Sequence, residues 1–346
     1  MEFLWVLYGV LLIAAVVMWP RLLRGRAEWA RAAADPALYG FVSQDMIDIR
    51  LPGPDPELTQ ALTATQRTQD WHAVSALLKG TPVEGEARWQ RVQTLAGAAA
   101  VELTRAPGKG GAWLRTWRVE EPGDPGGAAV QAAFLVQQAR RAPADSPDVT
   151  MILEEARTVA TEAALLAPGD PVPYIVDLAA DGDFETSWEK ITGLARHHMG
   201  AHLVALSRLP EQAARDFAER AAAYGPQGSL LPALPLFQVF AHLPELILSS
   251  GFYQSEVISR AVGGALYATE HASPNDPVVP LVRHLLISFL VRAERYPEAV
   301  EQIRHVDGFA GAAPWSYADD PAAAYALYRA QAIAGLQRNS APGPAR

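Results

Sequence analysis

Segments of good helix formers, separated by proline or glycine, run along almost the whole chain and constrain its fold more than any other feature. Alanine, leucine, arginine, glutamate and glutamine dominate these segments, and these residues have favourable helix propensities. Runs of alternating β-branched residues, which would indicate strands, are missing. The sequence therefore predicts an all-α protein.

Capping residues predict where the first helices begin and end. Asp55, followed by Pro56 and Glu57, favours a helix start, because a carboxylate caps the first N–H groups and proline fits the first turn. Another helix is expected from Asp70–Trp71 to Lys79–Gly80, where a basic last turn and a glycine are typical stop signals. Further helices are expected over 84–105, 127–141, 149–166, 171–180, 185–208, 211–223, 233–249, 253–271, 277–293, 297–306 and 320–337.

The segments between these helices include three regions of different character. Residues Tyr39–Leu51 are compatible with an extended segment, and Arg118–Gly127 is expected to be a turn-rich loop. Gly108–Gly111 contains a lysine but lacks the spacing and the Ser or Thr of a phosphate-binding loop, so it predicts a flexible turn. The tail 339–346 is expected to be disordered.

The N-terminal run Phe3–Trp19 carries no charged residue and is followed by Arg21, Arg24 and Arg26. About 17 to 25 apolar residues cross the hydrocarbon core of a bilayer. Trp5 and Trp19 lie near the two ends of the run, where indole rings favour the membrane interface. We therefore expect a transmembrane helix that contacts the lipid bilayer through residues 3–19.

The basic residues after this run predict its orientation. An excess of arginine marks the side that stays in the cytoplasm, so we expect a single-pass protein of the cell membrane with its N-terminus outside and its body in the cytoplasm. A cleaved signal peptide is the main alternative, but only Met1 and Glu2 precede the run and Val16–Pro20 lacks a small-residue cleavage site. A buried core helix is the other alternative.

The charge of the body argues against nucleic-acid binding. The full chain carries a net charge of -9, and residues 1–31 contribute four arginines and two glutamates, which leaves -11 for the rest. Nucleic-acid binders normally present a basic face. The chain has no cysteine, so thiolate metal sites and cysteine nucleophiles are excluded. No cofactor is expected.

The segment from Tyr296 to Val306 resembles a tetratricopeptide repeat. In that family an aromatic residue packs at the turn, a small residue lets the paired helices approach, and apolar residues further on face the neighbouring helix. Tyr296, Ala299, Ile303 and Val306 match these positions. The family's usual glycines are replaced by Ile287 and Glu294. The resemblance implies helix hairpins stacked into an array, with packing residues Tyr296, Ala299, Ile303 and Val306.

The repeats implied by this resemblance are degenerate. Similar proline-containing linkers recur at Pro168, Pro226 and Pro274, but their separations of 58 and 48 residues differ from the family's period of 34. A second stretch, with Trp188 followed by His197–His202, is similar to an uncharacterised family of helical proteins. The composition of the whole chain resembles actinobacterial membrane-anchored helical proteins. No activity is implied by either likeness.

One histidine pair deserves consideration as a metal site. His198 and His202 are four residues apart, which is the spacing of helical zinc ligands, and His242, Asp181 or Asp183 are candidates for a third ligand. The general-base glutamate of such motifs is replaced by Met199. The alternative is that both histidines pack or cap at a helix junction. Asp181, Asp183 and Glu185 are expected to form a turn and an N-cap rather than an acid–base pair. Trp89, Trp113 and Trp117 are expected to lie in the core.

These observations predict four regions and a binding function. We expect a transmembrane anchor with its basic flank at 1–26, an N-terminal helical region at 27–148, a tetratricopeptide-like domain at 149–338 and a disordered tail at 339–346. Leu230–Leu248 is expected to be a buried helix hairpin rather than a second span.

Because no catalytic signature is complete, the expected function is a scaffold, not an enzyme, that holds a protein or peptide partner at the membrane surface. The alternatives are a membrane-tethered metal-dependent hydrolase using His198 and His202, and a structural subunit of a larger membrane complex.

Overall fold

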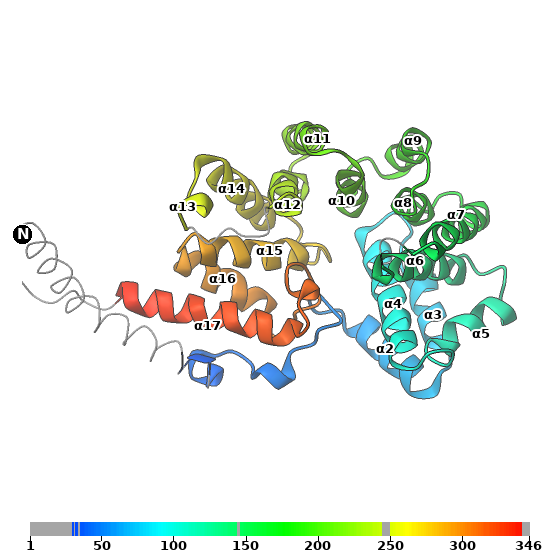
Figure 1. The fold of residues 1–346 in the computed structure, drawn as a ribbon, viewed down its shortest axis with the longest axis horizontal. Coiled ribbons are helices and arrows are strands. Elements are labelled where there is room, and N and C mark those ends of the chain that lie inside the picture. The colour runs from blue at the N-terminus through cyan, green and yellow to red at the C-terminus, as the bar shows by residue number, and fades with distance from the viewer. Residues whose placement is uncertain (1–29, 31, 34, 144–145, 244–249, 341–346) are drawn as a thin grey trace, which may run out of the picture. The chain divides into compact units, whose positions relative to one another are not determined.

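The computed structural model describes residues 30, 32–33, 35–143, 146–243 and 250–340. Within these ranges the chain is helical and forms no strand, apart from one isolated bridge between Asp48 and Phe309 (Figure 1). The expected all-α class is therefore confirmed. The expected anchor, Phe3–Trp19 with Arg21, Arg24 and Arg26, lies outside the described residues. None of the helices in the described part is long and apolar enough to span a bilayer.

The described chain divides into two compact units. The terminal unit contains the described residues up to Pro52, together with 250–254 and 283–340. The central unit contains the described residues of 53–243 and residues 255–282. The expected division into 27–148 and 149–338 is based on the tetratricopeptide resemblance and not on contacts between residues, and it stays a prediction.

The central unit is a succession of helices in which chain neighbours pack together, among them α6 with α7 and α11 with α12 (Figure 1). This is the packing that helix hairpins make. Its helices are α2 (Pro56–Thr68), α3 (His72–Gly80), α4 (Glu86–Arg105), α5 (Ala112–Glu120), α6 (Pro125–Arg141), α7 (Asp148–Leu166), α8 (Val172–Ala179), α9 (Phe184–Ala195), α10 (Met199–Arg208), α11 (Glu211–Tyr224), η3 (Leu231–Ala233), α12 (Leu234–Ala241) and α14 (Glu256–His271).

The terminal unit combines an irregular N-terminal segment with helices from the end of the chain. Helix α15 begins in the central unit and ends in this one. The elements are η1 (Pro36–Tyr39), η2 (Gln44–Met46), α13 (Ser250–Tyr253), α15 (Val279–Arg292), α16 (Tyr296–Val306), η4 (Trp315–Tyr317) and α17 (Pro321–Ser340).

Buried polar groups fix the central unit where helices meet. Asp124 caps α6 by accepting from the Gly126 N–H at 2.9 Å, and it also accepts from Ser75 Oγ at 2.8 Å. Burial alone would raise the pKa of this carboxyl, but these bonds and Lys79 outweigh it and lower the pKa. Removing one partner of such a network leaves a buried polar group unsatisfied, which costs about 1 to 3 kcal/mol.

The terminal unit has a fully buried histidine at its centre. His284 Nε2 donates to the Pro52 carbonyl at 2.8 Å, while its Nδ1 accepts from Trp315 Nε1 at 3.0 Å. Burial lowers the pKa of His284 to about 4. The neutral ring therefore ties α15 to the N-terminal segment and to η4.

Several expected caps and core positions are confirmed. Asp55 Oδ1 accepts from the Leu58 N–H at 3.0 Å at the start of α2. Asp183 caps α9 by accepting from the Thr186 N–H at 2.8 Å. Trp89, Trp113 and Trp117 are buried, as expected of core residues.

Other expected boundaries are wrong. The predicted helix over 185–208 is interrupted, because His198 caps a new helix, α10, after α9 has ended. The predicted loop over 118–127 is confined to residues 121–124, and α5 covers 112–120. Burial of Trp113 and Trp117 against the unit stabilises this nine-residue helix, which is too short to be stable alone.

The segments at both ends also differ from expectation. Tyr39–Leu51 is extended only in part: η1 ends at Tyr39 and η2 covers Gln44–Met46, whereas Ser43 and Ile47 have extended backbone and Asp48 forms a bridge with Phe309. Helix α12 ends at Ala241, and residues 244–249 lie outside the described part, so the hairpin expected in Leu230–Leu248 stays a prediction. Asn339 belongs to α17, whereas the rest of the expected tail from 341 onward is not described.

Candidate binding groove

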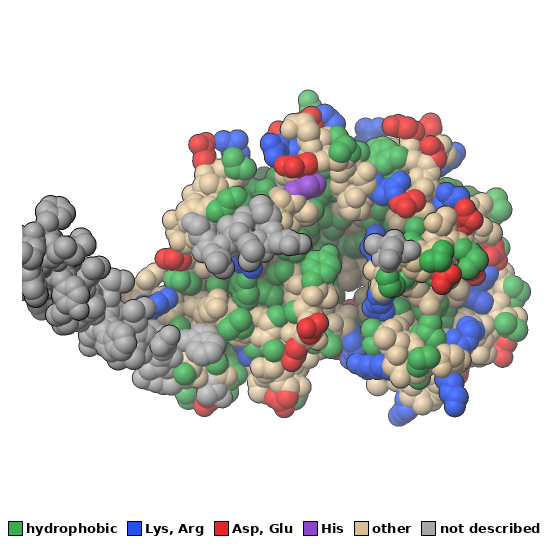
Figure 2. Space-filling model, viewed as in Figure 1, with side chains coloured by type: hydrophobic (Ala, Val, Ile, Leu, Met, Phe, Trp, Pro, Cys, Tyr) green, Lys and Arg blue, Asp and Glu red, His purple; other side chains and the backbone are tan. Residues whose placement is uncertain are grey.

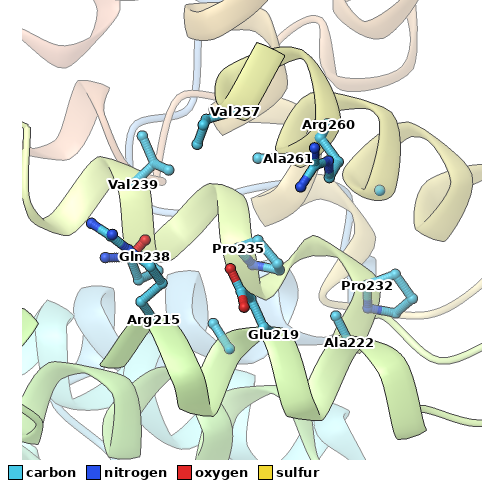
Figure 3. Close-up of a pocket in the computed structure, with 12 residues that line it drawn as sticks. Arg215, Glu219, Ala222, Pro232, Pro235, Gln238, Val239, Val257, Arg260 and Ala261 are labelled. Atoms are coloured by element: carbon cyan, nitrogen blue, oxygen red, sulfur yellow. The ribbon is translucent and has the colours of Figure 1, made fainter. Parts of the chain in front are cut away.

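A groove of about 340 Å³ lies among α11, α12 and α14 of the central unit (Figure 3). In Figure 1, α12 lies between α11 and α14, and η3 contacts both α11 and α14. Ligand pockets in proteins usually occupy about 300 to 1,000 Å³. The groove therefore has room for a small ligand or for a few side chains of a peptide.

The interior of the groove is mostly apolar. Pro232, Pro235 and Val239 line it from η3 and α12, and Val257 and Ala261 line it from α14. Val257 is 66% exposed although its side chain is hydrophobic. An apolar partner that covers these side chains would remove them from water, which is favourable in proportion to the area covered.

Close contact between α14 and η3 sets the width of the groove at one end. A Cβ atom at Gly264 would lie 2.6 Å from the Pro232 carbonyl oxygen. Real Cβ atoms do not approach backbone this closely, so the contact requires glycine. A Cβ atom at Gly263, the preceding residue, would meet no atom of a neighbouring element within 4 Å. The glycine requirement is therefore specific to the position that faces η3.

Two arginines and one glutamate add charge to the groove (Figure 3). Arg215 on α11 pairs with Glu211 at 3.1 Å, and Arg260 on α14 pairs with Glu256 at 2.9 Å. The arginine side chains are 49% and 77% exposed, respectively. Exposed pairs of this kind contribute only about 0 to 1 kcal/mol. Exchanging either glutamate for the carboxylate of a ligand would therefore cost little.

Polar groups of the groove restrict what it can bind. Glu219 extends from α11 toward the same space as Arg260 (Figure 3). Gln238 on α12 is buried, and its Nε2 lies 3.4 Å from His242 Nδ1. Basic and acidic side chains also stand next to each other over α11 and α14 on the face in Figure 2. The groove is thus amphipathic, with a small excess of positive charge.

The expected metal residues are placed elsewhere, at the start of α10. His198 caps this helix, since its Nδ1 accepts from the Ala201 N–H at 3.2 Å. His202 Nδ1 lies 2.9 Å from the His198 carbonyl oxygen, and its ring packs edge-on against Trp188. His198 instead packs edge-on against Trp89. The two rings therefore face different neighbours, as in the packing and capping alternative.

A partly buried carboxyl completes this helix start. Glu86, the first residue of α4, accepts from the Met199 N–H and, at 3.3 Å, from the Gly200 N–H, and it lies 3.2 Å from His198 Nδ1. Burial, with a smaller contribution from Asp276, raises the pKa of Glu86 to about 8 against the effect of these bonds. Burial, with a contribution from His202, lowers the pKa of His198 to about 4.

In the described part of the chain, no third metal-binding side chain joins His198 and His202. His198 Nε2 is buried without a hydrogen-bond partner in the described part of the chain. However, the described residues contain no group of three or more His, Asp or Glu side chains able to hold a metal ion. Neither Asp181 nor Asp183 supplies the third ligand, since Asp183 caps α9 and Asp181 pairs with Arg208.

The residues expected to pack the repeat lie on α16. Ala299, Ile303 and Val306 are fully buried. The Tyr296 ring lies against α17, where a Cβ at Gly335 would come within 2.4 Å of it. These contacts describe one pair of packed helices, α16 and α17, and the tetratricopeptide resemblance itself stays a prediction.

No local sequence pattern identifies the groove. Its arginines come from two helices separated by 45 positions, and each has an ordinary acidic neighbour four residues earlier. The adjacent glycines at 263 and 264 within a predicted helix were the one local signal, since glycine in a helix often marks close packing. No family model, curated protein or solved structure matches this chain.

Proposed function

We propose that this chain is a membrane-anchored helical scaffold that binds a protein or peptide partner in the groove among α11, α12 and α14, without catalysis. The observation that carries the proposal is the groove itself: an apolar interior flanked by arginines from two helices. Apolar area supplies affinity in such an interface, and the charges supply orientation.

The chemistry of the groove favours a particular class of peptide. Pro235 and Val239 suit apolar side chains, while Arg215 and Arg260 suit a carboxylate. Glu219 would repel a uniformly acidic segment. We therefore propose a short segment in which apolar residues lie next to a single aspartate, glutamate or C-terminal carboxylate.

The proposed anchor determines where this binding takes place. Phe3–Trp19 would hold the chain in the cell membrane with its body in the cytoplasm, and Arg21, Arg24 and Arg26 would each add about 1 kcal/mol by attracting anionic lipid. A partner bound in the groove would then be held at the membrane, where its effective concentration toward other membrane proteins is raised.

Peptide selection on the full chain tests this function. A displayed library of random peptides is panned against the chain in phosphatidylcholine nanodiscs. Selected peptides are then compared on Ala222→Trp, which fills the groove, and on Ala223→Trp, whose site is exposed on the same helix but does not line it. We expect Ala222→Trp to weaken binding at least about tenfold, because the indole displaces the peptide, and Ala223→Trp to leave it within about twofold.

The same selection can contradict the proposal. Circular dichroism and the melting temperature establish that each variant is folded. If folded wild-type chain enriches no peptide that pairs apolar residues with a carboxylate, or if both tryptophan variants bind equally well, the groove is not the binding site.

A further inference from the structure

The N-terminal segment of the terminal unit carries both buried and exposed apolar side chains. We call residues 35–52 the strap. Phe41, Ile47 and Leu51 are buried, with 6%, 8% and 1% of their surfaces exposed. Leu38 and Met46 are 72% and 69% exposed. The buried side chains attach the strap to the terminal unit. The exposure of Leu38 and Met46 to water needs another explanation.

Hydrogen bonds hold the strap in place. The Asp48 N–H donates to the Gly308 carbonyl at 2.8 Å, and the Asp48 carbonyl accepts from the Ala310 N–H at 2.9 Å. The Val42 N–H donates to Asp307 Oδ2 at 2.7 Å. Since these bonds fix the backbone, the exposed side chains cannot be buried by a simple rotation of the strap.

The exposed apolar side chains of the strap are concentrated in a short stretch of sequence. Ile49, at 45%, and Val42, at 37%, are exposed together with Leu38 and Met46 between residues 38 and 49. Single exposed hydrophobic residues are common on protein surfaces, whereas groups of them mark contact surfaces. The exposed apolar side chains of the strap are therefore a candidate contact surface.

The position of the strap in the sequence favours lipid as its partner. The expected span ends at Trp19, and only 15 residues separate it from Asp35. A chain of this length reaches at most roughly 50 Å when fully extended. If the span is inserted, the strap is therefore held within roughly 50 Å of the bilayer surface, and its exposed apolar side chains are within reach of lipid.

We propose that Leu38, Val42, Met46 and Ile49 of the strap insert into the interfacial region of the bilayer, so that the terminal unit rests on the membrane. This inference rests on the anchoring part of the proposed function. The contact is apolar rather than electrostatic, because Asp48 is already paired with Arg50 at 2.7 Å and Asp45 is exposed. Zwitterionic lipid therefore suffices, as it does for other apolar surfaces that lie in the interface.

Site-specific fluorescence tests the contact directly. The chain has no cysteine, so Leu38→Cys or Met46→Cys gives a single attachment point for an environment-sensitive dye. Each labelled full-length chain is placed in phosphatidylcholine nanodiscs that hold one copy and contain lipids with a nitroxide near the headgroup. Val119→Cys is the control, because Val119 is 81% exposed but lies on α5 of the central unit.

We expect dyes at residues 38 and 46 to be quenched at least about twofold more than the dye at residue 119. Equal quenching at these positions overturns the inference and points to another occupant, such as a second copy or residues 1–29. A dye at Val10→Cys, quenched by nitroxides deep in the bilayer, reports on the anchor separately. Quenching at residue 10 without quenching at residue 46 leaves the anchor standing and contradicts only the strap contact.

Discussion

At the scale of single residues, the start of α10 depends on a partner that is distant in the sequence. The first N–H groups of a helix need acceptors, and here the Glu86 carboxyl accepts from Met199 and Gly200 while His198 accepts from Ala201. A negative charge at this position would interact favourably with the helix dipole. Burial opposes that charge and raises the pKa of Glu86 to about 8.

This raised pKa predicts how stability changes with pH. The folded state binds the Glu86 proton more tightly than the unfolded state, whose pKa is 4.5. The stabilisation that this proton binding provides is therefore complete below about pH 4.5 and is lost as the pH rises toward 8. His198 behaves oppositely, because its pKa of about 4 in the folded state makes its contribution disappear as the pH falls from 6.5 to 4.

The substitution Glu86→Gln removes the pH dependence caused by Glu86 and keeps a hydrogen-bond acceptor at the start of α10. Between pH 6.5 and 8, the free energy of unfolding of the wild type should fall relative to that of the variant by on the order of 1 kcal/mol. Urea unfolding at several pH values measures this difference. Parallel pH profiles for the two proteins would show that Glu86 titrates normally.

At the scale of elements, glycine controls the packing of α14 against η3. Gly264→Ala places a Cβ atom against the Pro232 carbonyl, so it should destabilise the central unit by about 1 to 3 kcal/mol and weaken groove binding. Gly263→Ala, which meets nothing, should be neutral or stabilising by up to about 1 kcal/mol, because alanine has the better helix propensity. Urea unfolding of both variants checks this, and equal destabilisation would refute the contact.

The helices themselves were largely predictable from sequence, and the exceptions have identifiable causes. Asp55 is a local capping signal that caps α2 as expected, and Asp183 supplies the cap expected from the acidic residues around it. The interruption before α10 was missed because Glu86, 113 positions before Met199, supplies an acceptor. Helix α5 was missed because burial, rather than local propensity, stabilises it. The groove could not be predicted from local sequence either, because its lining residues come from different helices and no local pattern specifies how these helices pack.

At the scale of the whole molecule, we propose that each unit has one binding role. The terminal unit would contact the membrane through the strap, and the central unit would bind a peptide through the groove. Figure 2 shows intermixed charges over α11 and α14 rather than a basic face, in keeping with the net charge of -9. This charge pattern suits a peptide partner better than a nucleic acid.

A charge exchange in the groove, made on the full chain in nanodiscs, tests directly whether the groove binds a peptide carboxylate. Affinities are measured by fluorescence anisotropy for a selected glutamate-containing peptide and for the same peptide with lysine in place of glutamate. The proteins compared are the wild type, the double variant Arg215→Glu/Arg260→Glu, and Arg220→Glu, a control on α11 that does not line the groove.

We expect the wild type and the Arg220→Glu control to prefer the glutamate peptide by at least about tenfold, because Arg215 and Arg260 pair with its carboxylate. The double variant should reverse this preference and bind the lysine peptide more tightly. A preference for glutamate that is unchanged in the double variant would contradict the assignment of the groove as the binding site.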